Sequence, residues 1–209
     1  MKRLREAVGE EVEICLDVHT RMNLAQAMFF CREVEPYHPF FVEDPLRAEN
    51  PANYITLARS CGVPIAAGEQ WPNKWAFREA VESEAIHFAR VDLGIAGGIT
   101  EALKIAHMCE VHSVEVCPHN PLGPISTAAC TNLCMAVSNA SVLEVPHRPG
   151  TRANHIFPVQ MEWEDGYLRN PGRPGLGVEF DEAEAGKNRR EMNNWPPRLR
   201  RLDGSFTNW

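Results

Sequence analysis

The sequence predicts an α/β protein in which short parallel strands alternate with helices. Two features lead to this prediction. Six short apolar runs each end at a polar residue, and these polar residues follow one another at intervals of 23 to 27 positions. A strand, a loop and a returning helix together need about 25 to 30 residues, which matches this interval. Between the runs, apolar residues recur with helical spacing, and such alternation is typical of a parallel sheet.

The predicted strands are short apolar runs that stop at a charged or polar side chain. Their alternation with helical stretches favours strands that cross the sheet once and return through a helix. They lie within residues 12–17, 39–43, 64–69, 86–92, 114–119 and 142–144, and the residues that end them are Asp17, Glu43, Glu69, Asp92, His119 and Glu144.

The predicted helices carry apolar residues three and four positions apart, so that one face of each helix can pack on the sheet. Gly62 is expected to end the second helix, because glycine is favoured at helix C-termini. Thr100 is expected to cap the N-terminus of the fourth helix. The expected helices cover residues 23–34, 51–61, 74–81, 100–112 and 126–137.

The amino-acid composition of the sequence changes after Glu144. The remaining residues are rich in proline, glycine, arginine and tryptophan, with a strand-like piece at residues 158–163 and a loop at residues 171–177. We therefore divide the chain into residues 1–150, which carry the strand–helix units, and residues 151–209, a C-terminal extension that we expect to wrap back over the rest.

Composition and charge exclude several classes of protein. Hydrophobic residues make up 44% and charged residues 23% of the 209 residues, which is ordinary for a globular domain and argues against disorder. The formal net charge of −7 argues against a nucleic-acid-binding surface. No apolar run approaches the roughly 18 residues of a membrane span. The seven cysteines include no Cys-x-x-Cys pair, so we expect free thiols and a cytoplasmic location.

The carboxyl ends of the strands are where the sequence predicts chemistry. In a barrel of parallel strands these ends converge on one face, where the following loops build the active site. Asp17, Glu43 and Glu69 end three consecutive strands, and the repulsion among about three negative charges is costly without a counter-ion. A hard divalent cation resolves this repulsion, and Mg²⁺ suits carboxylate ligands that leave positions open for water and substrate.

Two histidines are placed for proton transfer at the same face. His119 ends the fifth run and can act as a base near neutral pH, and Asp92 on the preceding strand can hold its tautomer. His19 lies two residues after Asp17 and is expected to point to the same face by strand alternation, as a second candidate acid. One such residue alone is usually solvated, whereas six polar residues in phase with one structural period favour a shared site.

Two other features allow two interpretations each. Trp71, Trp75 and Phe77 either line a substrate pocket or cover the outside of the barrel. Gly97 and Gly98 either belong to a phosphate-binding loop or form a tight turn. The fuller fingerprint of a phosphate-binding loop is missing, which favours the turn.

Six motifs follow one another over nearly the whole chain, from Glu11 to Glu182. They are Asp-Val-His at 17–19, Phe-Val-Glu-Asp-Pro at 41–45, Ile-Ala-Ala-Gly-Glu at 65–69, Ala-Gly-Gly-Ile-Thr-Glu at 96–101, Pro-His-Asn-Pro-Leu-Gly-Pro-Ile at 118–125 and Pro-Gly-Leu-Gly-Val at 174–178. Each motif alone is weak evidence, but the ordered set is specific. It resembles the enolase superfamily and, within it, the galactonate dehydratases of the mandelate racemase/muconate lactonizing enzyme group.

The resemblance implies an incomplete TIM-type (β/α) barrel. The chain matches the third to eighth strands of the modified barrel of this superfamily, with residues 2–8 as the helix before the third strand. The C-terminal extension matches one that normally returns to the capping domain. The N-terminal capping domain and the first two barrel units have no counterpart in the sequence, so we expect a fragment. The family also suggests a homo-oligomer for the full-length form.

The resemblance further implies roles for the strand-end residues. Asp17, Glu43 and Glu69 take the places of the Mg²⁺ ligands on three successive strands. His119 with Asp92 takes the place of the dyad that removes a proton from the substrate.

His19 and Glu144 match residues that contact the substrate in this family. His19 falls where the dehydratases keep the acid that protonates the leaving hydroxyl, and Glu144 corresponds to a residue that hydrogen-bonds the substrate carboxylate. The implied reaction is a Mg²⁺-dependent dehydration of a small-molecule acid sugar, an aldonate, to a 2-keto-3-deoxy acid. Two alternatives stay open, namely an epimerase or racemase of the same superfamily and a truncated chain without activity.

Overall fold

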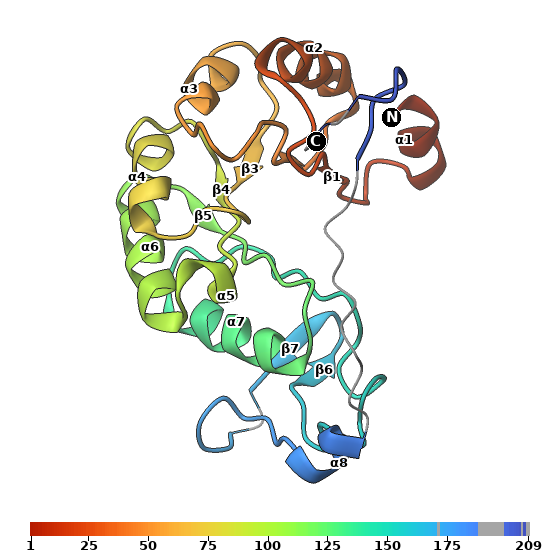
Figure 1. Ribbon diagram of the computed structural model, residues 1–209, viewed down its shortest axis with the longest axis vertical. Coiled ribbons are helices and arrows are strands. Elements are labelled where there is room, and N and C mark those ends of the chain that lie inside the picture. The colour runs from red at the N-terminus through yellow and green to blue at the C-terminus, as the bar shows by residue number, and fades with distance from the viewer. Residues whose placement is uncertain (171, 188–198, 206, 208–209) are drawn as a thin grey trace.

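A computed structural model describes residues 1–170, 172–187, 199–205 and 207, and its main feature is a five-stranded parallel sheet (Figure 1). The strands lie side by side in sequence order, which confirms the predicted alternation for five units. They do not close into a barrel within the described residues. The strands are β1 (Cys15–Asp17), β2 (Phe41–Glu43), β3 (Ile65–Ala67), β4 (Phe88–Ala89) and β5 (Glu115–Val116).

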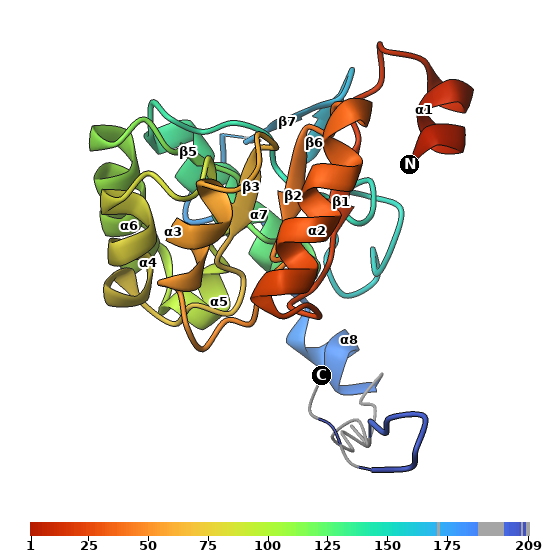
Figure 2. The same ribbon diagram turned by 90° about the horizontal axis from the view of Figure 1, so that it is seen from above.

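Helices cover the outer side of this sheet, and most of them form an arc around the strands (Figures 1 and 2). A helical crossover is what neighbouring parallel strands require. In the described part of the chain, no helix has the length and apolar character needed to cross a membrane. The helices are α1 (Lys2–Val8), α2 (Leu24–Val34), the 3₁₀ turn η1 (Glu35–Tyr37), α3 (Asn53–Ala58), α4 (Lys74–Glu82), α5 (Leu93–Ala96), α6 (Ile99–Val111), α7 (Pro124–Ala136) and α8 (Glu182–Lys187).

Asparagine side chains fix where two of these helices begin. Asn23 accepts a hydrogen bond from the backbone N–H of Gln26, and the Gln26 side chain accepts one from the N–H of Asn23. This capping box starts α2 at the predicted place. Asn73 starts α4 by accepting hydrogen bonds from the N–H groups of Trp75 and Ala76.

The start of α6 differs from the prediction. The helix begins at Ile99 with Gly98 at the N-cap, so Thr100 lies inside the first turn and is not the cap. Gly97 and Gly98 have φ values of 101° and 94°, and these left-handed conformations form a tight turn between α5 and α6. The turn interpretation of the two glycines is therefore correct.

Helix α3 is shorter than the helix expected at residues 51–61. Arg59, rather than Gly62, is its C-cap. Both the N–H and the hydroxyl of Ser60 donate to the carbonyl of Leu57, at 2.8 and 2.7 Å. This fold-back ends the helix before the glycine is reached.

The strand expected at residues 142–144 does not form. A single parallel bridge joins Val116 of β5 to Ala140 instead. The N–H of Val116 donates to Asn139 O at 2.7 Å, and the N–H of Ser141 donates to Val116 O at 2.9 Å. The segment that pairs with β5 thus lies at residues 139–141, before the predicted strand in the sequence. Among the described residues, no further strand pairs with the opposite edge of this segment.

The C-terminal extension contains an antiparallel hairpin formed by β6 (Glu162–Glu164) and β7 (Tyr167–Arg169). The hairpin overlaps only partly with the strand-like piece expected at residues 158–163. The expected loop at residues 171–177 contains neither helix nor strand where it is described. Residues of the extension that lie outside the described part are 171, 188–198, 206 and 208–209.

The extension contacts the strand–helix part of the chain through α7. Asn132 of α7 accepts a hydrogen bond from Asn170 Nδ2 at 2.8 Å and donates one to the carbonyl of Leu176 at 3.2 Å. These contacts place Asn170 and Leu176 of the extension against α7. The division of the chain at residue 150 stays a prediction.

Alternation along the strands separates two apolar clusters. On β2, Val42 joins the main core between the sheet and the helices. Phe41 joins a smaller cluster on the inner side of the sheet, together with Phe88 of β4. Glu43 and Arg90 lie two residues beyond these aromatic residues and therefore face the same inner side.

The aromatic residues that follow β3 belong to the outer side of the sheet. Trp71 and Phe77 are buried in the main core, where Trp71 packs edge-on against Tyr54 and Phe77 with ring centroids 5.6 and 4.9 Å away. Trp75 is 67% exposed. Trp71 and Phe77 thus cover the sheet, and none of the three predicted aromatic residues lines the cavity at the strand ends.

Candidate active site

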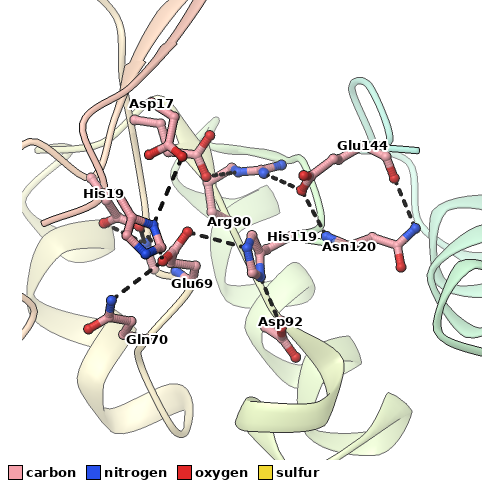
Figure 3. Close-up of polar contacts among 12 residues, drawn as sticks. Asp17, His19, Glu69, Gln70, Arg90, Asp92, His119, Asn120 and Glu144 are labelled. Carbon is pink, nitrogen blue, oxygen red and sulfur yellow. Dashed lines mark hydrogen bonds and ion pairs between the residues drawn. The ribbon is translucent and has the colours of Figure 1, made fainter. Parts of the chain in front are cut away.

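A cavity of about 560 Å³ lies on the inner side of the sheet, toward the carboxyl ends of the strands. Six of the seven residues predicted to form the site line this cavity. Asp92, the seventh, stands behind His119 and is buried (Figure 3). The six lining residues are Asp17, His19, Glu43, Glu69, His119 and Glu144.

Glu69 lies between two histidines (Figure 3). Its Oε1 lies 3.0 Å from Nδ1 of His19, and its Oε2 lies 3.3 Å from Nε2 of His119. The Glu69 side chain is 4% exposed, whereas that of His19 is 51% exposed. A molecule that binds at Glu69 is therefore within reach of both imidazoles.

His19 reaches the cavity by a different route from the one predicted. β1 ends at Asp17, and His19 has a left-handed φ of 54°, so strand alternation does not extend to it. A turn that also includes Thr20, with a φ of 60°, brings Nδ1 of His19 to 3.9 Å from Oδ2 of Asp17. The expected face is correct, but the reason for it was wrong.

Asp92 holds His119 from behind. Its Oδ2 lies 2.9 Å from Nδ1 of His119, and its Oδ1 accepts hydrogen bonds from the N–H groups of Gly94 and Ile95 at 2.7 and 3.0 Å. The latter two bonds cap α5 and fix the carboxylate. Because an ionised carboxylate only accepts hydrogen bonds, the pair assigns a proton to Nδ1 and directs Nε2 into the cavity.

Arg90 was not among the residues predicted from the sequence, yet it joins two that were. Its Nε lies 2.5 Å from Oε1 of Glu43, and its Nη2 lies 2.6 Å from Oε2 of Glu144. Its Nη1 donates to the carbonyl oxygens of Cys117 and Pro118, both at 3.1 Å. Arg90 is 3% exposed, and a buried cation requires partners of this kind.

Asp44, also missed, fixes the loop that carries Glu69. Its Oδ1 accepts hydrogen bonds from the Tyr54 hydroxyl at 3.0 Å and the Gly68 N–H at 3.2 Å, and its Oδ2 accepts one from the Glu69 N–H at 3.3 Å. Burial raises the pKa of Asp44 to about 7. Through the hydrogen bonds from Gly68 and Glu69, the Asp44 carboxyl group fixes the backbone at Glu69.

Both missed residues had a signal in the sequence. Arg90 follows Phe88 by two residues, so strand alternation places it on the inner side with the aromatic ring. Asp44 directly follows Glu43, and this second acid beside a strand-end acid is its signal, although its left-handed φ of 35° takes it out of strand alternation. Its carboxylate lies with those of Glu43 and Glu69 in one group of potential metal ligands.

Glu144 is held by the loop that follows β5. Its Oε2 accepts a hydrogen bond from the N–H of Asn120 at 2.9 Å, in addition to that from Arg90. The Asn120 side chain donates to the carbonyl of Glu144 at 2.9 Å and to the hydroxyl of Thr127 at 3.0 Å. These contacts fix Glu144 at the cavity although no regular strand carries it there.

Two groups of potential metal ligands lie at the site, each with ligand atoms within 4.8 Å of one another. One group contains Asp17, His19 and Glu69, and the other contains Glu43, Asp44 and Glu69. Glu69 belongs to both groups, and neither contains Asp17 together with Glu43. Burial raises the pKa of Glu43, although nearby Arg90 opposes this effect. Carboxylate oxygens on adjacent strand ends are hard ligands, so this donor set fits a divalent cation such as Mg²⁺.

Comparison with known proteins agrees with the motifs. The family model described as "Enolase C-terminal domain-like" matches residues 1–184. D-galactonate dehydratase of Ralstonia pickettii (strain 12J) is 38% identical to the chain over 213 residues, which cover 99% of this chain and 56% of that relative. The chain thus spans about half the length of the curated relatives that it matches.

Solved structures of similar proteins share the fold. An enolase from Agrobacterium radiobacter with bound sodium and L-malate has a TM-score of 0.88 and 30% identity, over 98% of this chain and 55% of that one. An enolase from Pantoea ananatis with bound D-gluconate and magnesium has a TM-score of 0.83 and 32% identity, over 89% of this chain and 45% of that one. The chain therefore belongs to the mandelate racemase/muconate lactonizing enzyme group of the enolase superfamily and matches its C-terminal domain.

Proposed function

We propose that the protein is a Mg²⁺-dependent dehydratase of acid sugars, of the galactonate dehydratase type. The observation that carries this proposal is the position of Glu69 between His19 and His119, of which the second is paired with Asp92. Dehydration needs a base for the α-proton and an acid for the leaving hydroxyl, and two imidazoles within reach of one bound molecule can supply both. Similarity to a D-galactonate dehydratase supports the same reaction class.

Asp17, Glu43 and Glu69 would hold the metal, and Glu144 would hydrogen-bond the substrate carboxylate. When Mg²⁺ is bound, its chemistry is to polarise the substrate carboxylate and to neutralise the charge that develops as the α-proton leaves. Similarity to an enolase solved with D-gluconate and magnesium supports a magnesium ion and an acid sugar as the ligands of this cavity. Arg90 keeps the Glu43 side chain in place on the inner side of the sheet.

His119 would act first, as the base. Its Nε2 takes the proton from the carbon next to the substrate carboxylate, and Asp92 stabilises the imidazolium charge. His19 then donates a proton to the hydroxyl on the β-carbon, so that the C–O bond breaks and water leaves. The electron pair of the broken C–H bond becomes the double bond of an enol. The enol takes up a proton at the β-carbon and becomes a 2-keto-3-deoxy acid.

Product formation from D-galactonate and its stereoisomeric aldonates tests this proposal. We expect a 2-keto-3-deoxy acid in the presence of Mg²⁺ and none after its removal with EDTA. His19→Asn and His119→Asn should each lower turnover by about 10²- to 10⁴-fold, the range for loss of a general acid or base. His107→Asn, on the exposed side of α6, is the matched control and should keep wild-type turnover. Unchanged turnover in either of the first two variants would refute the assigned roles.

The assay must allow for the fact that the chain spans about half the length of its curated relatives. The chain is assayed alone and also joined to the N-terminal part of the Ralstonia pickettii dehydratase that it does not match. Activity of either form supports the proposal. If only the joined form is active, the chain alone is a truncated chain without activity. Inactivity of both forms on every aldonate contradicts the proposal.

An epimerase of the same superfamily is the second candidate function. The observation in its favour is that the two imidazoles approach Glu69 from two sides. If they faced opposite sides of the α-carbon, one could remove the proton and the other return it, with the hydroxyl retained. Exchange of the α-proton with solvent deuterium without loss of the hydroxyl would identify this reaction.

A further inference from the structure

Arg90 connects two parts of the cavity that have different roles in the proposed function. Its Nε faces Glu43, which belongs to a group of potential metal ligands. Its Nη2 faces Glu144, which does not belong to such a group (Figure 3). The Arg90 and Glu43 side chains are 4% and 7% exposed, so this pair is shielded from water, whereas the Glu144 side chain is 34% exposed. The carbonyl oxygens of Cys117 and Pro118 anchor the third nitrogen and keep the guanidinium between the two carboxylates.

One guanidinium charge therefore serves two carboxylates. The attraction between Arg90 and Glu43 is strong because little water screens this buried pair, and water screens the contact with Glu144 more. If Glu144 lost its charge, Glu43 alone would balance Arg90 and their attraction would increase. Glu43 would then be a poorer metal ligand, since a cation must compete with Arg90 for the same carboxylate.

We propose that Arg90 is a positioning residue that couples metal binding at Glu43 to the charge and placement of Glu144. This inference rests on the proposed function, which assigns the metal to one carboxylate and the substrate to the other. Such coupling is reciprocal in binding free energy. A cation at Glu43 weakens the hold of Arg90 on that residue and strengthens its hold on Glu144. The substrate side of the cavity is thus ordered by occupation of the metal side.

The test measures the Mg²⁺ affinity of the 209-residue chain by isothermal titration calorimetry, without substrate. Glu144→Gln is expected to weaken Mg²⁺ binding by about fivefold, the lower end of typical couplings. With Arg90→Lys, a single ammonium keeps the charge but cannot contact both carboxylates. In that background Glu144→Gln should change the affinity by less than about twofold. Glu115→Gln, at the exposed start of β5, removes the same charge and is the matched control.

An equal effect of Glu144→Gln with arginine and with lysine at position 90 would overturn the coupling, because it would show that Glu144 acts on the metal directly. A second measurement needs no change at position 90. The NMR signal of the Arg90 Nε–H should shift when Mg²⁺ is added, and it should shift differently in Glu144→Gln. An Nε–H signal that does not respond to Mg²⁺ would also overturn the proposal.

These outcomes can be separated from failure of the proposed function. If the chain shows the coupling but neither the chain nor the joined form dehydrates an acid sugar, the reaction is refuted and the coupling stands. A chain that dehydrates an acid sugar, while Glu144→Gln leaves its Mg²⁺ affinity unchanged, refutes the coupling alone. A chain that binds no Mg²⁺ overturns the coupling, whereas the reaction is then decided by the activity of the joined form.

Discussion

Asp92 serves two partners, and substitution can separate the two roles. Its carboxylate contacts His119 with one oxygen and caps α5 with the other. Asp92→Asn keeps a capping oxygen but offers an N–H₂ group where His119 needs an acceptor. We expect turnover to fall by roughly 10²-fold or more, while the free energy of unfolding changes by less than about 0.5 kcal/mol.

Asp92→Ala is the companion variant for this prediction. It removes the cap as well, so it should also lower the free energy of unfolding by about 1 kcal/mol. Steady-state kinetics and urea unfolding measure the two effects. Wild-type turnover in Asp92→Asn would show that the contact with His119 does not serve proton transfer.

Tyr54 supports the site from the main core. Its hydroxyl, fully buried, donates to Oδ1 of Asp44, which in turn holds the Gly68–Glu69 backbone. Tyr54→Phe removes one donor from a buried carboxyl group, and we expect the free energy of unfolding to fall by about 1–3 kcal/mol. Tyr167→Phe, at a site 73% exposed, is the control and should be neutral in urea unfolding. Equal stability of the two variants would contradict the role given to this hydrogen bond.

The candidate residues could be read from the sequence because each ends an apolar run. Such a rule finds Glu69 and His119, whose positions follow from strand order alone. It does not find Arg90, because the partner that explains a buried arginine, Glu43, lies 47 positions away and its distance cannot be read from periodicity. It also gives the wrong reason for His19, because a left-handed turn is not visible in an alternating pattern.

Among the elements, α1 is connected to η1 and the residue that follows it through Arg5. Arg5 is 8% exposed and donates to the carbonyl oxygens of Gly9, Val12, Tyr37 and His38, at 2.7 to 3.1 Å. Arg5→Met removes these charge-assisted hydrogen bonds, and we expect a loss of about 2 kcal/mol in stability with faster hydrogen exchange in α1.

Arg3→Met is the matched control, because Arg3 lies on the exposed side of the same helix. Hydrogen–deuterium exchange followed by mass spectrometry compares the two variants over residues 2–8. Equal protection of α1 in both variants would show that packing, not Arg5, holds the helix.

The sequence predicted the elements that follow the repeating strand–helix interval. It predicted less well the elements whose ends depend on a single local contact. The first five strands follow a regular interval, and Asn23 marks the start of α2 directly. The segment that precedes the sixth run pairs with β5 through one bridge at Ala140. The sixth run itself, residues 142–144, forms no strand. Because the turn at Gly97 and Gly98 starts α6 at Ile99, Thr100 lies inside the helix and does not cap it.

At the scale of the whole molecule, five strands with their helices form an open parallel sheet (Figure 1). The sheet is short of a closed barrel, and the chain spans 56% of the length of its Ralstonia pickettii relative. The formal charge of −7 includes the carboxylates that gather at the cavity. A cation bound among them should therefore stabilise the whole fold.

Mg²⁺ is expected to raise the thermal unfolding temperature of the chain. At a concentration of about 100 times the dissociation constant, binding to the folded state adds about 2.7 kcal/mol. Glu69→Gln changes the residue that belongs to both groups of potential ligands and should abolish this Mg²⁺-dependent rise. Glu79→Gln, on the exposed side of α4, should keep it. A rise that persists in Glu69→Gln would show that the ion binds elsewhere.

The measurement that tests the proposed reaction most directly is proton NMR of the active form with D-galactonate and Mg²⁺ in deuterated water. We predict that the signal of the proton next to the carboxylate disappears together with the signal of the proton on the hydroxyl-bearing β-carbon. A 2-keto-3-deoxy acid with one deuterium at the β-carbon should appear at the same rate. Exchange of the α-proton with the hydroxyl retained, or no change for any aldonate in the panel, would contradict dehydration at this site.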